Sequence, residues 1–136
     1  MRRVSRRDHA RTDRVHARMV KSETRRTLRW ITRSEAETAI IGEALGYALS
    51  GGEEVRLRGE AGVGKTIFVK GLARGLGVAS EILSPTFVLQ HQHDGRVPLA
   101  HMDLYRLKAG AVPELGVGEL LVAGAVVAIE WSDRLV

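Results

Sequence analysis

The spacing of apolar residues along the chain changes from a period of two to a helical period and back again. Residues 27–32 alternate apolar and polar side chains, which is typical of a short strand with one buried face. Residues 35–50 carry apolar side chains at helical spacing and predict an amphipathic helix. Its predicted buried face consists of Ala36, Ile40, Ala44 and Ala48, flanked by Ile41 and Leu45.

Local signals predict where the first helices begin and end. Ser34, followed three residues later by Glu37, matches a capping box at the start of the first helix, and Gly51-Gly52 is expected to end it. Residues 54–58 then predict a strand and residues 65–76 a second helix. Gly75 and Gly77 are expected to close that helix.

The second half of the chain predicts mostly strands. Residues 87–90 and 97–102 read as two strands joined by a hairpin at Asp94-Gly95. Residues 108–124 are rich in glycine and hold at most a short helix or two near 113–121. Residues 125–129 are an uninterrupted apolar run, which suits a strand covered on both faces by helices. This order predicts an α/β three-layer sandwich with a largely parallel sheet.

Charge divides the chain into a tail and a domain. The net charge is +5, but residues 1–29 hold eleven Lys and Arg against three Asp and Glu, whereas residues 30–136 hold ten against thirteen. We expect residues 1–25 to be a disordered basic tail and residues 26–136 to form one domain. The tail has three open interpretations: a nucleic-acid-binding arm, a solvated tail without a role, or an artefact of start-site choice with Met19 as the true start.

Composition excludes several classes of protein. The chain has no cysteine, so disulfides and thiolate metal sites are excluded. No apolar run approaches the roughly 18–20 residues that a membrane span needs.

A glycine-rich loop lies between the strand predicted at 54–58 and the helix predicted at 65–76. The loop reads Gly59-Glu60-Ala61-Gly62-Val63-Gly64-Lys65-Thr66. Its glycines allow backbone N–H groups to converge on phosphate oxygens, and the positive end of the following helix dipole points at the same anion. Lys65 would reach the β- and γ-phosphates and Thr66 would offer its hydroxyl to magnesium. The loop predicts binding of a purine nucleoside triphosphate, ATP with Mg²⁺; the alternative is a fortuitous turn.

Carboxylates follow two of the predicted strands. Glu130 ends the apolar run and Asp103 ends the strand at 97–102, so each is a candidate to hold magnesium or its water. The sequence leaves open which of them holds the metal and which orients water. Thr86 lies in a proline-containing loop that could close over the γ-phosphate, and Trp131 could lie near the nucleotide or fill the sheet edge.

Three histidines are candidate metal ligands. His91 and His93 alternate on one side of a strand, and His101 lies on the next one. Because no further ligand is evident, we favour a solvated hairpin over a metal site.

The order of these motifs resembles the TsaE (YjeE) family, the small bacterial ATPases of tRNA threonylcarbamoyladenosine biosynthesis. The resemblance covers about residues 27–134 and depends on the glycine-rich loop and three further segments. These are Ser84-Pro85-Thr86-Phe87, His101-Met102-Asp103-Leu104-Tyr105-Arg106-Leu107 and Val127-Ala128-Ile129-Glu130-Trp131.

The resemblance implies a P-loop α/β fold and weak ATP hydrolysis that partner proteins raise. The reaction served is threonylcarbamoyl transfer to N6 of the adenosine beside the anticodon. The implied partners are the transferase subunit and its paralogue, with tRNA reached indirectly through that complex and no membrane involved. The implied location is cytoplasmic.

The resemblance also assigns roles to residues. Lys65 and Thr66 match the phosphate and magnesium positions, and Asp103 matches an Asp needed for hydrolysis. Glu130 matches the acidic residue on the magnesium side, and Trp131 matches the Trp beside it. The implied catalytic residues are therefore Asp103, Lys65 and Glu130, and the implied metal ligands are Thr66 and Glu130.

Further matches concern the nucleotide contacts. Ser84 and Thr86 match a switch-like loop, and residues 33–35, with Ser34 among them, match a region near the base. The chain departs from the family at Glu60-Ala61 and at Ile67, neither of which removes a backbone donor of the loop. The family commonly continues for a few strands beyond its Glu-Trp pair, whereas this chain ends at Val136, so we expect those strands to be missing or the chain to be truncated.

Two other functions compete with this one. A small-molecule P-loop kinase needs a lid with arginines, and residues 108–124 contain none. A nucleotide-dependent module that binds RNA or protein without hydrolysis is the other alternative.

Overall fold

A computed structural model describes residues 26–59, 64–83, 90–104 and 115–131. The chain divides into two units, residues 1–31 and 32–136, and the elements below belong to the second. The helices are α2 (Glu35–Ala48), α3 (Lys65–Gly75) and α4 (Val117–Val122), and the strands are β1 (Glu54–Leu57), β2 (Gln90–His93), β3 (Leu99–Asp103) and β4 (Val126–Glu130). The bounds confirm the two predicted long helices, the short helix near 113–121 and the strands at 54–58 and 125–129 to within a few residues.

Four strands form one sheet in the described part of the chain, in the order β1-β4-β3-β2. β4 pairs in parallel with both β1 and β3, whereas β2 pairs antiparallel with β3 through the predicted hairpin at Asp94-Gly95. β4 is therefore central and all five of its residues are buried, as its apolar run predicted.

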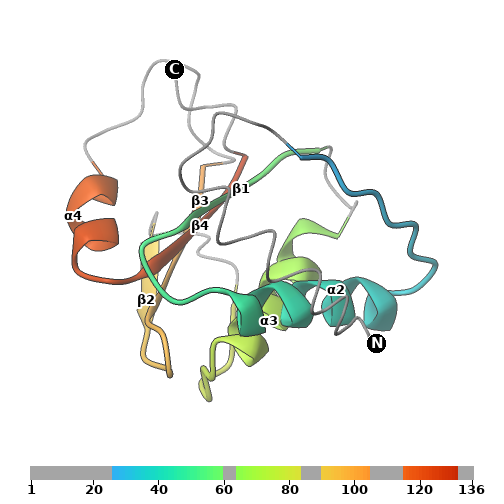
Figure 1. The fold of residues 1–136 in the computed structure, drawn as a ribbon, viewed down its shortest axis with the longest axis horizontal. Helices are drawn as coiled ribbons and strands as arrows, with labels where there is room; N and C mark the ends of the chain where they lie inside the picture. Colours follow the sequence, from blue (N-terminus) through green and yellow to red (C-terminus); the bar gives the residue numbers. More distant parts are fainter. Residues whose placement is uncertain (1–25, 60–63, 84–89, 105–114, 132–136) are drawn as a thin grey trace. The chain divides into compact units, whose positions relative to one another are not determined.

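The side chains of β4 alternate between two cores, one on each face of the sheet. Val126 and Ala128 join the core beneath α3, and Val127 and Ile129 join the core beneath α4. Figure 1 shows α2 and α3 on one side of the sheet and α4 on the other. This arrangement confirms the predicted three-layer sandwich with a largely parallel sheet.

The buried face of α2 differs from the prediction. Ala36, Ile40, Ala44 and Ala48 are exposed, and the buried residues are Ala39, Gly42 and Gly46. The reason is a close approach between α2 and α3. A Cβ on Gly42 or Gly46 would collide with the backbone of α3, and one on Gly71 or Gly75 would collide with the backbone of α2. Glycines decide this contact, whereas helical periodicity of apolar side chains gives no weight to a residue without a side chain.

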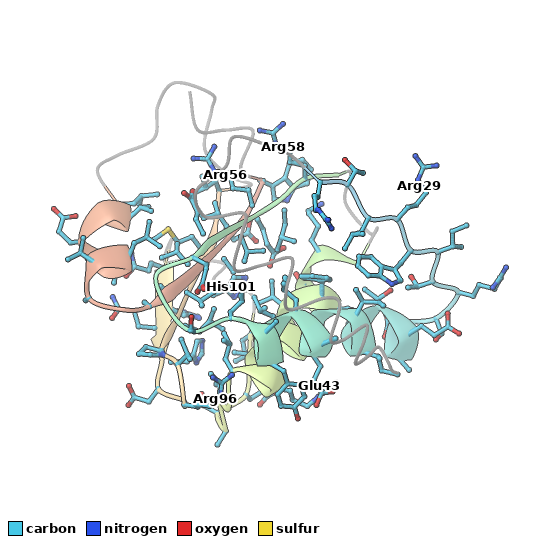
Figure 2. All side chains as sticks on the ribbon, in the orientation of Figure 1. Arg29, Glu43, Arg56, Arg58, Arg96 and His101 are labelled. Carbon is cyan, nitrogen blue, oxygen red and sulfur yellow. The ribbon has the colours of Figure 1, made fainter. Side chains whose placement is uncertain are left out.

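Arg96 joins the hairpin to the ends of both helices. Its guanidinium donates hydrogen bonds to the carbonyl oxygens of Gly46 (3.1 Å) and Gly75 (2.9 Å). Figure 2 shows Arg96 at the hairpin, close to the C-terminal ends of α2 and α3. Since these carbonyls lie in the last turns of the two helices, a cation here complements both helix dipoles.

The strand predicted at residues 27–32 does not form. These residues have no regular structure, and Leu28, Trp30 and Ile31 are exposed. A strand requires another strand to accept and donate its backbone hydrogen bonds, and alternation of side chains does not provide one.

Of the strand predicted at 87–90, only Gln90 falls within the described residues, and it begins β2. No helix in the described ranges combines the length and the apolar character that crossing a membrane requires.

Candidate functional site

Three parallel strands end side by side at one edge of the sheet. Leu57 of β1 and Asp103 of β3 are both in register with Glu130, the last residue of β4. α3 begins near this edge, because its first residue follows β1 after the short glycine-rich loop. Ligands of open α/β sheets bind outside the carboxyl ends of the strands, so this edge is the place to look for a site.

Two ends of the glycine-rich loop are described, and both have backbone angles that favour glycine. Gly59 has φ 138° and Gly64, the N-cap of α3, has φ 101°. Glu60, Ala61, Gly62 and Val63 lie outside the described residues. The first turn of a helix leaves backbone N–H groups without helical partners, so the start of α3 is a favourable position for an anion.

Lys65 is the first residue of α3 and lies between the loop and Trp131. Its Nζ donates a hydrogen bond to the carbonyl oxygen of Gly59 at 2.7 Å and lies 4.3 Å from the centroid of the Trp131 ring. The side chain is largely buried, so its charge stands in surroundings that screen it less than water does. An ammonium at this position can attract phosphate oxygens placed at the start of α3.

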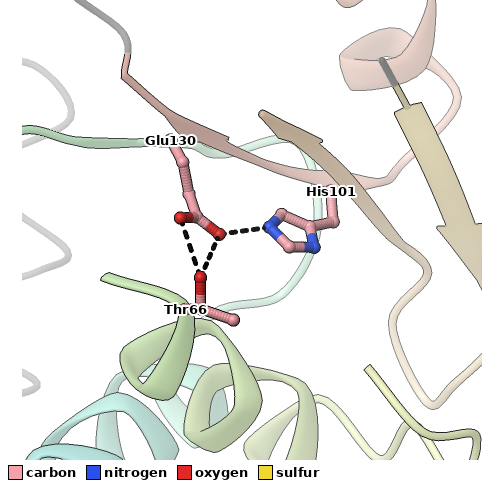
Figure 3. A network of polar contacts seen from close by, with 3 residues as sticks. All are labelled: Thr66, His101 and Glu130. Atoms are coloured by element: carbon pink, nitrogen blue, oxygen red, sulfur yellow. Dashed lines mark hydrogen bonds and ion pairs between the residues drawn. The ribbon is translucent and has the colours of Figure 1, made fainter. Parts of the chain in front are cut away.

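Thr66 is bonded to the acid at the end of β4. Its hydroxyl lies 3.0 Å from Oε1 and 3.1 Å from Oε2 of Glu130, which is almost fully buried (Figure 3). The two residues are 64 positions apart in sequence. Side chains alternate along β4, so Glu130 lies on the same face as Val126 and Ala128, the face covered by α3. Its carboxylate therefore contacts that helix.

The oxygen donors of Thr66 and Glu130 fit magnesium. Mg²⁺ prefers oxygen ligands and is usually held by one or two carboxylates, with waters and substrate phosphates in the remaining positions. The Thr66 hydroxyl and the Glu130 carboxylate, in contact at the start of α3, form such a sparse oxygen set. Within the described ranges, no group of three or more His, Cys, Asp or Glu side chains is arranged to hold a metal ion by itself.

His101 also contacts Glu130, and the sequence analysis did not anticipate this contact. The ring is fully buried and its Nε2 lies 2.6 Å from Oε2 of Glu130. A signal was present: His101 and Asp103 are two residues apart on one strand, so both side chains fall on the same face. That face could be identified only once β3 was known to pair with β4.

Asp103 ends β3 opposite Glu130 and is half-buried. By alternation along β3 it shares the α3 face with Leu99 and His101. The structure therefore brings Asp103 to the same edge as Lys65, Thr66 and Glu130.

Trp131 turns the chain directly after β4. Its φ of 60° is in the left-handed region, which costs a non-glycine residue roughly 1–2 kcal/mol. Its N–H donates to the carbonyl oxygen of Leu57 at 3.1 Å, which fixes the turn to the end of β1. The ring packs on the core beneath α4 and also faces Lys65, so it both fills the sheet edge and lies beside the loop.

The Ser34 side chain caps the N-terminus of α2. Its hydroxyl accepts a hydrogen bond from the Glu37 N–H at 3.1 Å, and the Glu37 carboxylate accepts one from the Arg33 N–H at 2.6 Å. This confirms the N-cap at Ser34. One turn later, the Thr38 methyl lies 3.6 Å from where a Cβ on Gly64 would stand, so the start of α2 is beside the loop. Ser84 and Thr86 lie outside the described residues.

His91 and His93 are half-buried and not simply solvated. Their rings meet edge to face at 6.2 Å between centroids, and His93 Nδ1 lies 3.0 Å from the Ser80 hydroxyl. Burial, followed by the nearby His101 and His91, lowers the pKa of His93. The surroundings of His93 therefore favour the neutral form of its ring.

Comparisons with known proteins identify the family. A sequence model of the family described as "Threonylcarbamoyl adenosine biosynthesis protein TsaE" matches residues 32–136. Curated proteins named "tRNA threonylcarbamoyladenosine biosynthesis protein TsaE" are 43% identical in Treponema pallidum and 36% identical in Bacillus subtilis, each over 79% of this chain. The matches span 81% and 68% of those relatives.

A third relative, from Nostoc, is 42% identical over 72% of this chain and 64% of its own length. The crystal structure of YdiB from Bacillus subtilis superposes with a TM-score of 0.68 at 32% identity, covering 83% of this chain and 70% of that one. The chain therefore belongs to the TsaE family, whose members are named for tRNA threonylcarbamoyladenosine biosynthesis.

Proposed function

We propose that this protein binds ATP with Mg²⁺ and hydrolyses the ATP in support of tRNA threonylcarbamoyladenosine modification in the cytoplasm. The observation that carries the proposal is the contact between Thr66, the second residue of α3, and the buried Glu130 at the end of β4. It joins the end of the glycine-rich loop to a carboxylate on the neighbouring strand, as a phosphate and magnesium site requires.

The loop and its surroundings would bind the triphosphate. Lys65 would pair with the β- and γ-phosphates, and the backbone of Gly59–Thr66 would donate hydrogen bonds to their oxygens. We also assign contacts with the nucleotide to Ser34, Thr86 and Trp131. The position of α2 beside Gly64 and that of Trp131 beside Lys65 support the first and third of these assignments.

The two carboxylates would have different roles. Thr66 and Glu130 would hold Mg²⁺, because their oxygens already lie together. When bound, the ion would neutralise charge on the transferred phosphoryl group. Asp103 would orient the attacking water, because it ends the adjacent strand at the same edge and is less buried than Glu130.

Hydrolysis by the isolated protein would be slow, and partners would raise it. The names of the relatives place them in threonylcarbamoyladenosine biosynthesis. We therefore propose the transferase subunit and its paralogue as the partners, with tRNA reached through their complex. Hydrolysis would reset this complex between turnovers, and the transfer itself would take place on the partners.

Replacing Lys65 tests nucleotide binding. We expect Lys65→Ala to weaken binding of a fluorescent ATP analogue by about 10- to 100-fold, the cost of losing hydrogen bonds to a charged group. Lys70→Ala is the matched control, since Lys70 is an exposed lysine on the same helix and should bind as the wild type does. Unchanged affinity in Lys65→Ala would overturn the proposal.

A further inference from the structure

His101 is a buried polar residue with a direct contact to the proposed magnesium site. The ring is 0% exposed, and its Nε2 approaches Oε2 of Glu130 to 2.6 Å. Figure 3 shows the Glu130 carboxylate between the His101 ring on one side and the Thr66 hydroxyl on the other. Both side chains are buried, so water has little access to this contact.

The direction of the hydrogen bond follows from the chemistry of the two groups. A carboxylate oxygen accepts readily, so we assign the tautomer in which Nε2 of His101 carries the hydrogen and donates it to Oε2. His101 Nδ1 is buried and has no hydrogen-bond partner in the part of the chain that the structure describes. Glu130 is therefore the hydrogen-bond partner that orients this ring within the described residues.

The two oxygens of Glu130 are not equivalent. In the described part of the chain, Oε2 accepts from both His101 and Thr66, whereas Oε1 accepts from Thr66 alone. Oε1 thus keeps more of its capacity to accept from a ligand. A glutamate side chain has several rotatable bonds, so its carboxylate would adopt other orientations without a second point of attachment.

His101 is held rigidly enough to provide that attachment. It lies in the middle of β3, in register with Ala128 of β4, so it reaches diagonally across the ladder to Glu130 on the same face. Its neighbours on β3, Ala100 and Met102, are anchored in the core beneath α4.

We propose that His101 is a positioning residue that fixes the Glu130 carboxylate through Oε2 and leaves Oε1 directed to Thr66 and magnesium. This inference rests on the proposed function. Partners of metal-binding carboxylates and imidazoles tune metal affinity in this way, and their loss costs roughly 10- to 100-fold in metal affinity or activity.

Two amide substitutions separate positioning from packing. The amide nitrogen of Gln extends as far as Nε2 of His, whereas that of Asn ends near Nδ1. We expect His101→Gln to keep the hydrogen bond and His101→Asn to lose it. The readout is the affinity for a fluorescent ADP analogue measured with Mg²⁺ and again with EDTA.

The gain in affinity that Mg²⁺ provides should fall by about 10-fold or more in His101→Asn and change by less than about 3-fold in His101→Gln. Affinity in EDTA should match the wild type in both. His91→Gln is the control, because His91 is the residue paired opposite His101 on β2 and its ring packs edge to face on His93. If the gain in affinity that Mg²⁺ provides were the same in His101→Asn as in His101→Gln, whether unchanged or reduced from the wild type, the positioning role would be overturned.

A measurement on the unaltered protein covers the case in which a variant does not fold. ¹⁵N-edited NMR of the His101 ring should show the tautomer with hydrogen on Nε2, and this signal should shift when Mg²⁺ is added to the ADP complex. A ring with hydrogen on Nδ1 only would overturn the proposal. Failure of the unaltered protein to bind the ADP analogue at all would instead contradict the proposed function, so the two failures are distinguishable.

Discussion

The chemistry of the site depends on residues whose positions are set by local geometry. Lys65 and Thr66 occupy the first turn of α3, where the positive end of the helix dipole favours an anion. Glu130 and Asp103 are neighbours in the ladder but differ in environment, because Glu130 is buried against Thr66 and Asp103 is half-buried. On the proposed function, this difference assigns magnesium binding to Glu130 and the orientation of water to Asp103.

Replacing Asp103 tests that separation. We expect Asp103→Ala to lower partner-stimulated ATP hydrolysis by about 10²- to 10⁴-fold, the usual contribution of a general base or acid. Nucleotide binding should stay close to the wild type. Phosphate release in the presence of the transferase partners measures the first effect and fluorescence titration the second.

The control for this experiment is Asp94→Ala, since Asp94 is an exposed carboxylate in the hairpin. If Asp103→Ala hydrolysed ATP as fast as Asp94→Ala, the water-orienting role assigned to Asp103 would be wrong.

At the scale of elements, the close contact between α2 and α3 fixes the positions of the two helices relative to each other. Gly42 and Gly46 of α2 face Gly71 and Gly75 of α3, and the helices approach so closely that backbone meets backbone. This contact sets where α3 begins relative to α2, and the start of α2 lies beside Gly64. Arg96 reinforces the far end of the same pair of helices.

Adding one methyl group at this contact should destabilise the fold. A Cβ on Gly71 would collide with the Ala39 backbone, which cannot move aside as a flexible side chain could. We expect Gly71→Ala to lower the free energy of unfolding by about 1–3 kcal/mol, the usual cost of overpacking. Urea denaturation followed by circular dichroism measures the change.

Gly118→Ala is the matched control for that variant. Gly118 lies within α4. In the described part of the chain, nothing beyond its own stretch of helix lies within 4 Å of an added Cβ, so alanine should be neutral or stabilise by up to about 1 kcal/mol. Equal effects of the two substitutions would show that the helices do not meet as closely as we describe.

At the scale of the whole molecule, positive charge and the proposed site lie in different parts of the sequence. Residues 1–29 hold eleven of the 21 Lys and Arg, whereas the family match begins at residue 32. Residues 1–25 lie outside the described residues, so the tail and its boundary at residue 25 stay predictions. The site residues all belong to the unit of residues 32–136.

Deleting residues 1–25 should therefore leave affinity for the ATP analogue and the melting temperature unchanged. The physical reason is that the contacts described above for Lys65, Thr66 and Glu130 all join residues of the unit 32–136. A large loss of affinity or of stability in the shortened protein would show that the tail belongs to the domain. The full-length chain, measured in parallel, is the reference.

The sequence by itself determined the features that depend on neighbouring residues. The glycine-rich loop, the cap at Ser34, the hairpin at Asp94-Gly95 and the buried strand at 126–130 each reflect local backbone preferences or an apolar run. The order of these motifs was also sufficient to indicate the family.

Tertiary structure alone decided the features that depend on what packs against them. The strand predicted at 27–32 does not form because it has no strand to pair with, and α2 buries Gly42 and Gly46 because α3 approaches so closely. The contacts of Glu130 with Thr66 and His101 join residues 64 and 29 positions apart. No local pattern encodes such contacts, because they arise only when β3, β4 and α3 are brought to the same edge of the sheet.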